Sequence, residues 1–220
     1  NYTRKQQDGF SIKSYQRAQE AQEKGYFKNE IIPLTNSKGD SIAMDEEPGK
    51  ANFEKIPLIK PVFEKDGTIT AANASKLNDG AAAVVLMSAD SVEKHSLKPI
   101  ARILSHCSFA HDPKWFTTAP GKAIDKVLNK SGLSKQDIDL WEINEAFAAV
   151  TMAAIDDYNL DDTKVNIYGG AVALGHPIGA SGTRILVTLI NALETMDKNI
   201  GLATLCIGGG EASAMVIEKL

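Results

Sequence analysis

The sequence predicts an α/β layered domain in which helices cover both faces of a mixed β-sheet. Beyond residue 66, short apolar runs alternate with segments whose apolar residues recur at helical spacing. The last two apolar runs are separated only by Gly208, Gly209 and Gly210, which predicts a terminal antiparallel hairpin. A chain of 220 residues with 43% hydrophobic residues is long enough to bury such a sheet in one large domain.

The first part of the chain differs from the rest and predicts a helix followed by a charged excursion. A helix is expected over residues 3–24 and would end at Gly25. Thr3 and Gln6 have the spacing of a capping box at its start. Residues 27–66 are charged and contain several prolines, so we expect surface loops with short β pieces there. A domain boundary is expected between residues 66 and 80.

The later elements alternate between strand and helix. Residues 81–88 form a continuous apolar run, which predicts a strand buried on both faces of the sheet. Helices are expected at 89–95, 121–131, 145–156 and 181–196, and further strands at 99–108, 137–143, 164–168, 200–207 and 212–218.

Composition and charge exclude several classes of protein. The net charge of −4 argues against a nucleic-acid-binding surface, and no apolar run is long enough to span a bilayer. Cys107 and Cys206 are the only cysteines, which argues against a disulfide framework and favours a soluble protein of a reducing compartment. The cysteines and the four histidines lack metal-ligand spacing, so we expect no metal and no cofactor. Because the chain starts at Asn1 without a signal or transit peptide, we expect it to be cut from a longer one.

His176 and Cys206 each lie in a glycine-rich frame. Dense glycine indicates backbone that turns with positive φ or closely approaches another group. His176 precedes a predicted helix N-terminus, which would lower its pKa and favour a role as a base; a hydrogen-bonded histidine in a tight turn is the alternative. Cys206, taken alone, is more typical of a core residue. The glycine turn that follows it favours function, since free N–H groups there could bind an oxyanion.

Two further segments carry candidate binding residues. Residues 144–147 lie at a predicted strand-to-helix junction, where layered sheets hold ligands. Asn144 could cap the helix, or it could hold a water or a substrate carbonyl. Glu145 could complement the helix dipole or support a catalytic residue. Residues 70–75 are small enough for close approach of an elongated ligand, although a packed loop is the stronger interpretation of these residues alone.

In their order along the chain, these motifs resemble the signatures of the thiolase family. Residues 144–147 and the turns Gly175-His176-Pro177 and Cys206-Ile207-Gly208 correspond to its three signatures, and residues 72–75 and 78–82 match a further family segment. The resemblance is closest to the biosynthetic acetoacetyl-CoA thiolases (acetyl-CoA C-acetyltransferases), in particular those of animal mitochondria. It covers only the C-terminal portion of the family. Residues 1–75 resemble the remainder of its CoA-contacting loop subdomain, and residues 76–220 resemble its C-terminal domain, with the thiolase-like layered fold.

The resemblance implies a reversible Claisen condensation of two acetyl-CoA molecules to acetoacetyl-CoA and CoA. Cys206 would be the acid/base at the α-carbon, and His176 would activate a nucleophilic cysteine and polarise a thioester oxygen. Asn144 would hold the water that completes one oxyanion hole with His176, and the Gly208 amide would serve the other. The nucleophilic cysteine lies in the half of the family's length that this chain does not match, so we expect the isolated chain to be inactive.

The resemblance also implies where the substrate lies. Ser75 would bond the pantetheine amide of CoA, while Ala74, Ala146 and Phe147 would line the same tunnel. Phe116 would belong to the acyl pocket. The complete protein would be a homo-oligomer, a dimer or a tetramer, in the mitochondrial matrix or the cytoplasm.

One departure from the family and two alternatives bear on this interpretation. Phe10 stands where the animal mitochondrial members have a tyrosine implicated in potassium binding, and a phenyl ring offers no oxygen ligand, which argues against potassium activation. One alternative is a non-catalytic acyl-CoA-binding or assembly module of a degenerate thiolase-like protein. The other is a ketosynthase-type condensing enzyme, which usually has two histidines; Cys206 in place of the second argues against it.

Overall fold

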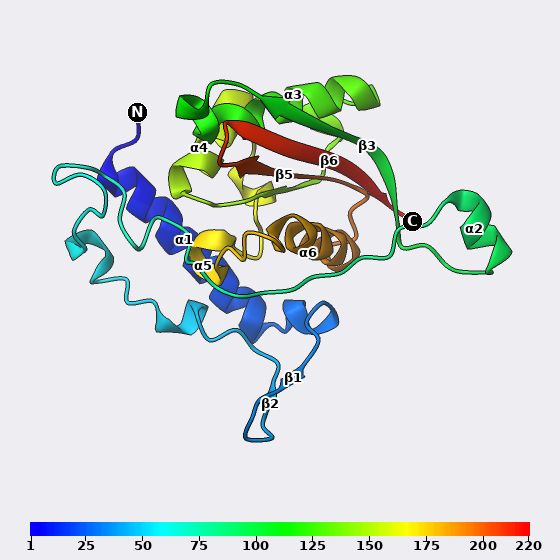
Figure 1. Cartoon of the computed structure of the whole chain (residues 1–220), viewed down its shortest axis with the longest axis horizontal. Helices are drawn as coiled ribbons and strands as arrows, with labels where there is room; N and C mark the ends of the chain where they lie inside the picture. The colour runs from blue at the N-terminus through cyan, green and yellow to red at the C-terminus, as the bar shows by residue number, and fades with distance from the viewer.

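A four-stranded mixed sheet forms the centre of the molecule, described for residues 1–220 by a computed structural model (Figure 1). Its strands are β3 (Ala101–Ala110), β4 (Leu140–Ile143), β5 (Ile200–Ile207) and β6 (Glu211–Lys219), in the order β3-β6-β5-β4. β4 runs parallel to β5, and β6 runs antiparallel to both of its neighbours. The predicted α/β class, mixed sheet and terminal hairpin are therefore confirmed.

Helices cover both faces of this sheet, as the sequence predicts. α3 (Ala119–Ser131) and α4 (Ala148–Tyr158) lie on one face, and α6 (Ser181–Thr195) lies on the other (Figure 1). Leu202 packs in the core beside α3, while its neighbour Ala203 packs in the core beside α6. This alternation follows from the period of two along a strand and gives the sheet two separate apolar cores.

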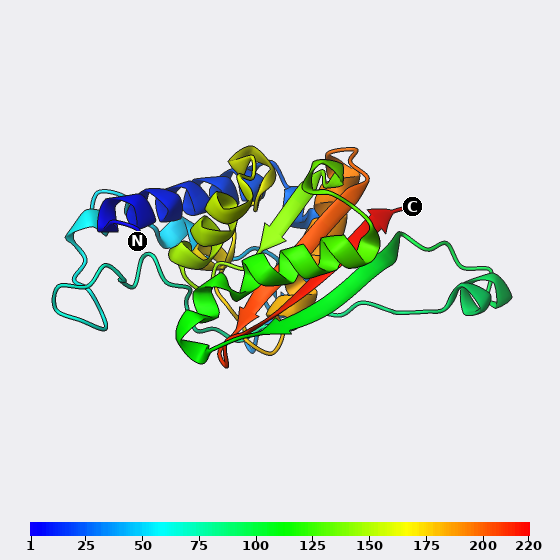
Figure 2. The ribbon, with the colours of Figure 1, turned by 90° about the horizontal axis from the view of Figure 1, so that it is seen from above.

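The N-terminal part packs beside α6 and the short helix α5 (Ala171–Leu174). α1 (Arg4–Glu23) begins at the predicted capping box, and Gly25 follows its end with φ of 70°. α2 (Ala89–Lys94) and the small hairpin of β1 (Leu34–Thr35) and β2 (Ser41–Ile42) project from the body of the molecule (Figures 1 and 2). No helix combines the length and the apolar character that crossing a bilayer would require.

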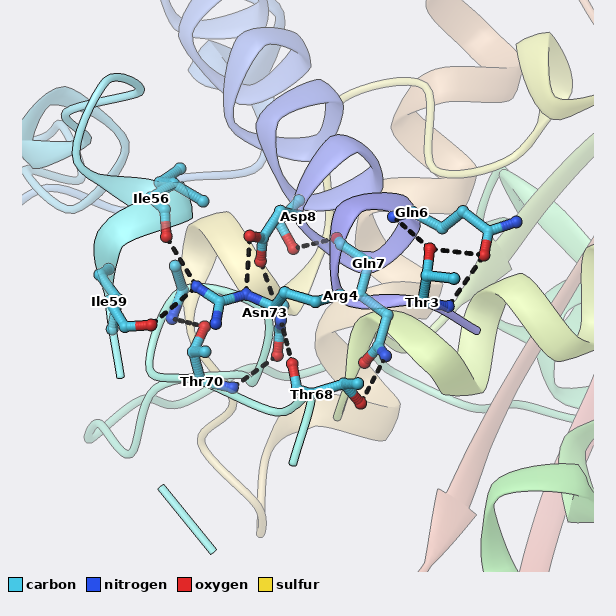
Figure 3. A network of polar contacts seen from close by, with 12 residues as sticks. Thr3, Arg4, Gln6, Gln7, Asp8, Ile56, Ile59, Thr68, Thr70 and Asn73 are labelled. Carbon is cyan, nitrogen blue, oxygen red and sulfur yellow. Dashed lines mark hydrogen bonds and ion pairs between the residues drawn. The ribbon is translucent and has the colours of Figure 1, made fainter. Parts of the chain in front are cut away.

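Buried polar contacts on α1 fix the chain that leads toward the site. Asp8, which is 4% exposed, accepts hydrogen bonds from Arg4 at 2.7 Å and from the Asn73 side-chain amide at 3.0 Å (Figure 3). Asn73 also accepts from the Thr70 amide at 2.8 Å. Residues 70–75 are thus held as a packed turn against α1 by groups that have lost their water, which makes these bonds costly to break.

Two of the predicted strands are wrong. Residues 81–88 form no strand: the segment is extended and largely exposed, with Val85 88% and Leu86 72% exposed. The apolar run has the composition of a buried strand, but no strand of this chain pairs with it. Residues 164–168 contribute only one bridge, between Val165 and Trp141, because the chain turns at Asn166, which has φ of 46°.

Two element boundaries also differ from the prediction. The helix expected at 145–156 starts only at Ala148, since Phe147 is extended with φ of −139° and ψ of 151°. The strand expected from residue 137 starts at Leu140, after a 3-10 turn at Lys135–Asp137. Residues 144–147 are therefore an extended loop at the end of β4, the edge at which layered sheets hold ligands.

Candidate active site

Close contacts fix the backbone around His176 and leave no room for a side chain at Gly175. Gly175 has φ of 87°, and a Cβ placed on it would lie 2.4 Å from the Asn78 side-chain oxygen. The His176 amide donates to the Lys76 carbonyl at 2.9 Å. The predicted close approach is therefore present at Gly175, and it brings His176 beside the segment that follows Ser75.

Two side chains hold the ring of His176 from opposite sides. Nδ1 lies 2.5 Å from Ser181 Oγ, and that hydroxyl donates to the Pro177 carbonyl at 3.0 Å. Since the hydroxyl proton is already used, Ser181 accepts from Nδ1–H, and the lone pair of the neutral ring is on Nε2. Nε2 lies 3.4 Å from the side-chain nitrogen of Asn144.

The environment of His176 favours its neutral form. Burial lowers the pKa of His176 below its ordinary 6.5, and the positive charge of Arg184 lowers it further. At neutral pH the ring is therefore unprotonated at Nε2, whose lone pair accepts a long hydrogen bond from the Asn144 amide group, and a neutral ring is the form that a general base needs.

Asn144 is placed by the end of the sheet and keeps one polar atom free. Its amide donates to the Thr204 carbonyl at 3.0 Å, which continues the β4–β5 ladder by one residue. The side chain is 2% exposed, and its oxygen has no hydrogen-bond partner. A buried carbonyl oxygen without a partner is an unsatisfied acceptor, suited to a water or a substrate donor.

Cys206 lies near the end of β5, beside the loop that carries Asn144. It packs in a small cluster with Ala146 and Val150 and is 9% exposed. Burial raises the pKa of the Cys206 thiol to about 11, so the group carries its proton at neutral pH. Gly208 follows in the exposed turn to β6, and a Cβ there would meet open space, so packing does not require this glycine. Cys107 is separate, since its thiol donates to the Ala123 carbonyl in the core under α3.

The predicted substrate-binding residues meet along one pair of extended segments. Ala74 pairs with Phe147 in an antiparallel bridge, and the Ser75 amide donates to the Ala146 carbonyl at 3.0 Å. The ring of Phe116 lies 6.0 Å from that of Phe147 and packs against the Cys206 cluster. These residues thus connect the segment at residues 74–75 to the Cys206 thiol.

Some residues of the site were not identified from the sequence. The ring of Phe63, which is 73% exposed, lies 6.4 Å from that of Phe147 and makes a second edge-to-face contact with it, so Phe63, Phe147 and Phe116 form an aromatic row. Nothing in its charged surroundings distinguishes it. Ser181 was expected only near a helix start, and its contact with His176 depends on the turn at Gly175. Phe10 is half-buried on α1.

Comparison with known proteins identifies the family of this chain. The profile described as "Thiolase, C-terminal domain" matches residues 97–219, and "Thiolase, N-terminal domain" matches residues 1–90. The chain belongs to the thiolase family. This thiolase chain is 51% identical to the mitochondrial acetyl-CoA acetyltransferase of Bos taurus over 225 residues, covering 100% of the chain and 53% of that relative.

Solved thiolase structures agree with the fold. An acetyl-CoA acetyltransferase from Bacillus anthracis superposes with a TM-score of 0.95 at 44% identity, covering 99% of this thiolase chain and 56% of that one. A thiolase from Ascaris suum in complex with coenzyme A gives 0.91 at 45% identity, with 100% and 56% covered. The chain therefore spans about half the length of the relatives it matches. The N-terminal profile includes the exposed run at 81–88.

Proposed function

We propose that this chain provides part of the active site of an acetyl-CoA C-acetyltransferase, which interconverts two acetyl-CoA molecules with acetoacetyl-CoA and CoA. The observation that carries the proposal is that the loop after β4 contacts both a neutral imidazole and a buried protonated thiol: Asn144 lies 3.4 Å from Nε2 of His176, and Ala146 packs against Cys206. Asn144 links the two groups. Its side chain lies beside His176, and its loop packs against Cys206 through Ala146.

The first stage transfers an acetyl group to a nucleophilic cysteine supplied by the remainder of the full-length protein. His176 accepts the proton of that thiol, and the thiolate attacks the thioester carbonyl of the first acetyl-CoA. The new sulfur–carbon bond replaces the bond from that carbon to the CoA sulfur. Cys206 gives its proton to the departing CoA thiolate, which leaves Cys206 ionised and His176 protonated.

The second stage forms the carbon–carbon bond. The Cys206 thiolate removes an α-proton from the second acetyl-CoA, and the resulting enolate carbon attacks the acetyl group on the nucleophile. The sulfur–acetyl bond breaks, and the nucleophile regains its proton from His176. A thiol with a pKa of about 11 gives a strongly basic thiolate, which suits a weakly acidic α-carbon.

Preorganised donors would stabilise the oxyanions of both stages. A water held by the free oxygen of Asn144 would face the enolate oxygen together with His176, and the Gly208 amide would face the acetyl carbonyl. Loss of one such donor typically costs about 3 to 4 kcal/mol of transition-state stabilisation. The pantetheine arm of CoA would lie along residues 74–75, whose packed turn is rigid through Asn73 and Asp8.

The proposal is tested by turnover of acetoacetyl-CoA in the full-length protein. His176→Ala and Cys206→Ala should each lower kcat by about 100-fold or more, because each removes a proton-transfer group. The matched controls are His95→Ala, at an exposed position, and Cys107→Ala, at a buried thiol of the core. Near wild-type turnover in either site variant would refute its assigned role. Binding of CoA without turnover in the wild-type protein would instead favour a non-catalytic acyl-CoA-binding module.

A further inference from the structure

Glu145 is a buried carboxylate that the proposed chemistry does not use. It is 1% exposed and accepts three hydrogen bonds: from Ser14 Oγ at 2.7 Å, from Asn166 Nδ2 at 2.9 Å and from the Val172 amide at 3.1 Å. Burial raises the pKa of Glu145, and these three donors oppose that rise. All three partners donate, so the carboxylate acts here purely as an acceptor.

The three partners come from the segments that hold the proposed catalytic groups. Val172 lies at the start of α5, four residues before His176. Asn166 bonds both main-chain groups of Ile143, the residue before Asn144, each at 2.8 Å. Ser14 lies on α1. One carboxylate therefore joins the loop of Asn144, the loop of His176 and the helix beneath them.

The glycine-rich segment before His176 leaves room for this carboxylate at Gly170. A Cβ on Gly170 would lie 2.3 Å from the Glu145 carboxyl carbon, so no other residue fits without displacing it. The Gly170 amide donates to Ser14 Oγ at 3.0 Å, which leaves the Ser14 proton for Glu145. The direction of each bond in the cluster is thereby fixed.

We propose that Glu145 is a positioning residue for the proposed acyl transfer, setting the spacing between Asn144 and His176 through its bonds to Asn166 and Val172. The inference rests on the proposed function. Glu145 does not contact the imidazole in the structure, and it acts through the two loops that it joins. The 3.4 Å approach of Asn144 to Nε2 is the geometry that depends on it.

Substitution by glutamine tests this geometry at almost constant volume. Asn166 cannot turn its amide, because both its atoms are committed to Ile143, and the Val172 amide can only donate. In either orientation of its side-chain amide, a glutamine at position 145 must therefore point its own NH2 group at a donor, either Asn166 Nδ2 or the Val172 amide. Glu145→Gln should push the two loops apart while leaving the apolar core unchanged.

The matched control is Glu142→Gln. Glu142 is also buried, at 2% exposed, and lies three positions earlier, but its carboxylate makes no hydrogen bond to either loop. In the full-length protein, Glu145→Gln should lower kcat about 10- to 100-fold and keep the KM for acetyl-CoA within about threefold of the wild-type value. Glu142→Gln should keep both kcat and KM within about threefold of the wild-type values. Ser14→Ala, which removes one donor, should give a smaller loss of the same kind.

A spectroscopic readout separates this proposal from the proposed function. The Nδ1 proton of His176, in its 2.5 Å bond to Ser181, should give a strongly downfield NMR signal in protein labelled with ¹⁵N-histidine. Glu145→Gln should shift or broaden that signal, and Glu142→Gln should leave it in place. An unchanged signal in Glu145→Gln overturns the positioning role whatever turnover does. If Glu145→Gln fails to fold, the same comparison is made with Ser14→Ala. Wild-type protein without turnover would refute the proposed function only.

Discussion

At the scale of single residues, the proposed chemistry depends on which nitrogen of His176 carries the proton. Ser181 decides this, because its hydroxyl donates to the Pro177 carbonyl and can only accept from Nδ1. Without that acceptor, the proton can move to Nε2, which removes the lone pair required to take a proton from a thiol. In the proposed mechanism, the Ser181 hydroxyl would thereby control the protonation of the base.

We predict that Ser181→Ala in the full-length protein lowers kcat about 10- to 100-fold, the range typical for loss of a group that orients a ligating or catalytic histidine. Ser181→Thr, which keeps the hydroxyl, should retain more activity. Ser105→Ala is the matched control, since Ser105 is also a buried serine but its hydroxyl has no partner. Equal activity of Ser181→Ala and Ser105→Ala would contradict the assigned tautomer.

The residues of the site were predictable to the extent that local sequence encodes them. His176 and Cys206 could be selected because glycine frames surround them, and Gly170 and Gly175 do have the close approaches that such glycines indicate. Phe63 could not be identified, because its position in the aromatic row depends on how residues 27–66 fold back over the site. The exact role of Glu145 was likewise hidden, since its partners Ser14 and Val172 are far from it in sequence.

At the scale of elements, the contact between β4 and α6 buries a carboxyl group, that of Glu142, near the positive charge of Arg184. Glu142 points from β4 toward the core beside α6, and burial raises its pKa to about 8 despite the nearby positive charge of Arg184. The terminal nitrogens of the Arg184 guanidinium are buried without a hydrogen-bond partner. The folded protein therefore holds a proton on Glu142 in a pH range where the unfolded chain, at about 4.5, has released it.

This difference predicts a pH dependence of stability. Between about pH 5 and about pH 8 the folded state binds more protons at Glu142, so the free energy of unfolding should fall as pH rises, by up to about 1.4 kcal/mol per pH unit. Glu142→Gln should remove the contribution of Glu142 to that slope and leave the smaller contributions of the other buried carboxyl groups, Glu30, Asp45 and Glu145. Urea unfolding at several pH values in this window measures it in both proteins. Parallel pH profiles for wild type and variant would show that Glu142 is ionised throughout.

The terminal hairpin was predicted from local sequence, whereas the apolar run at 81–88 was predicted as a strand and forms none. The terminal hairpin follows from two apolar runs and three glycines, and Gly210 is required there because a Cβ would lie 2.4 Å from the His111 carbonyl oxygen. The run at 81–88 has equally strong β composition. Composition, however, does not specify which strand will pair with it, and pairing is what defines a strand.

At the scale of the whole molecule, residues 77–88 are the clearest feature that the chain's own contacts leave unexplained. Leu77, Val85 and Leu86 are 89%, 88% and 72% exposed, and the amides of 81–88 donate no backbone hydrogen bond. Soluble proteins rarely leave such a contiguous apolar segment in water. The same segment falls within the N-terminal thiolase profile, and the chain spans about half the length of its relatives.

We therefore predict that this segment gains protection when the chain is part of the full-length protein. In hydrogen exchange, the amides of 81–88 should exchange within seconds in the 220-residue chain and far more slowly in the full-length protein, because only there can they pair with other strands. β5 is the internal control, since its ladder with β4 and β6 is complete in the chain itself and should protect it in both. Under the proposed division of the active site, which places the nucleophilic cysteine outside these 220 residues, the chain alone should also fail to cleave acetoacetyl-CoA. Equal exchange at 81–88 in both proteins would mean that the run has another role, and thiolysis by the chain alone would contradict the proposed division of the active site.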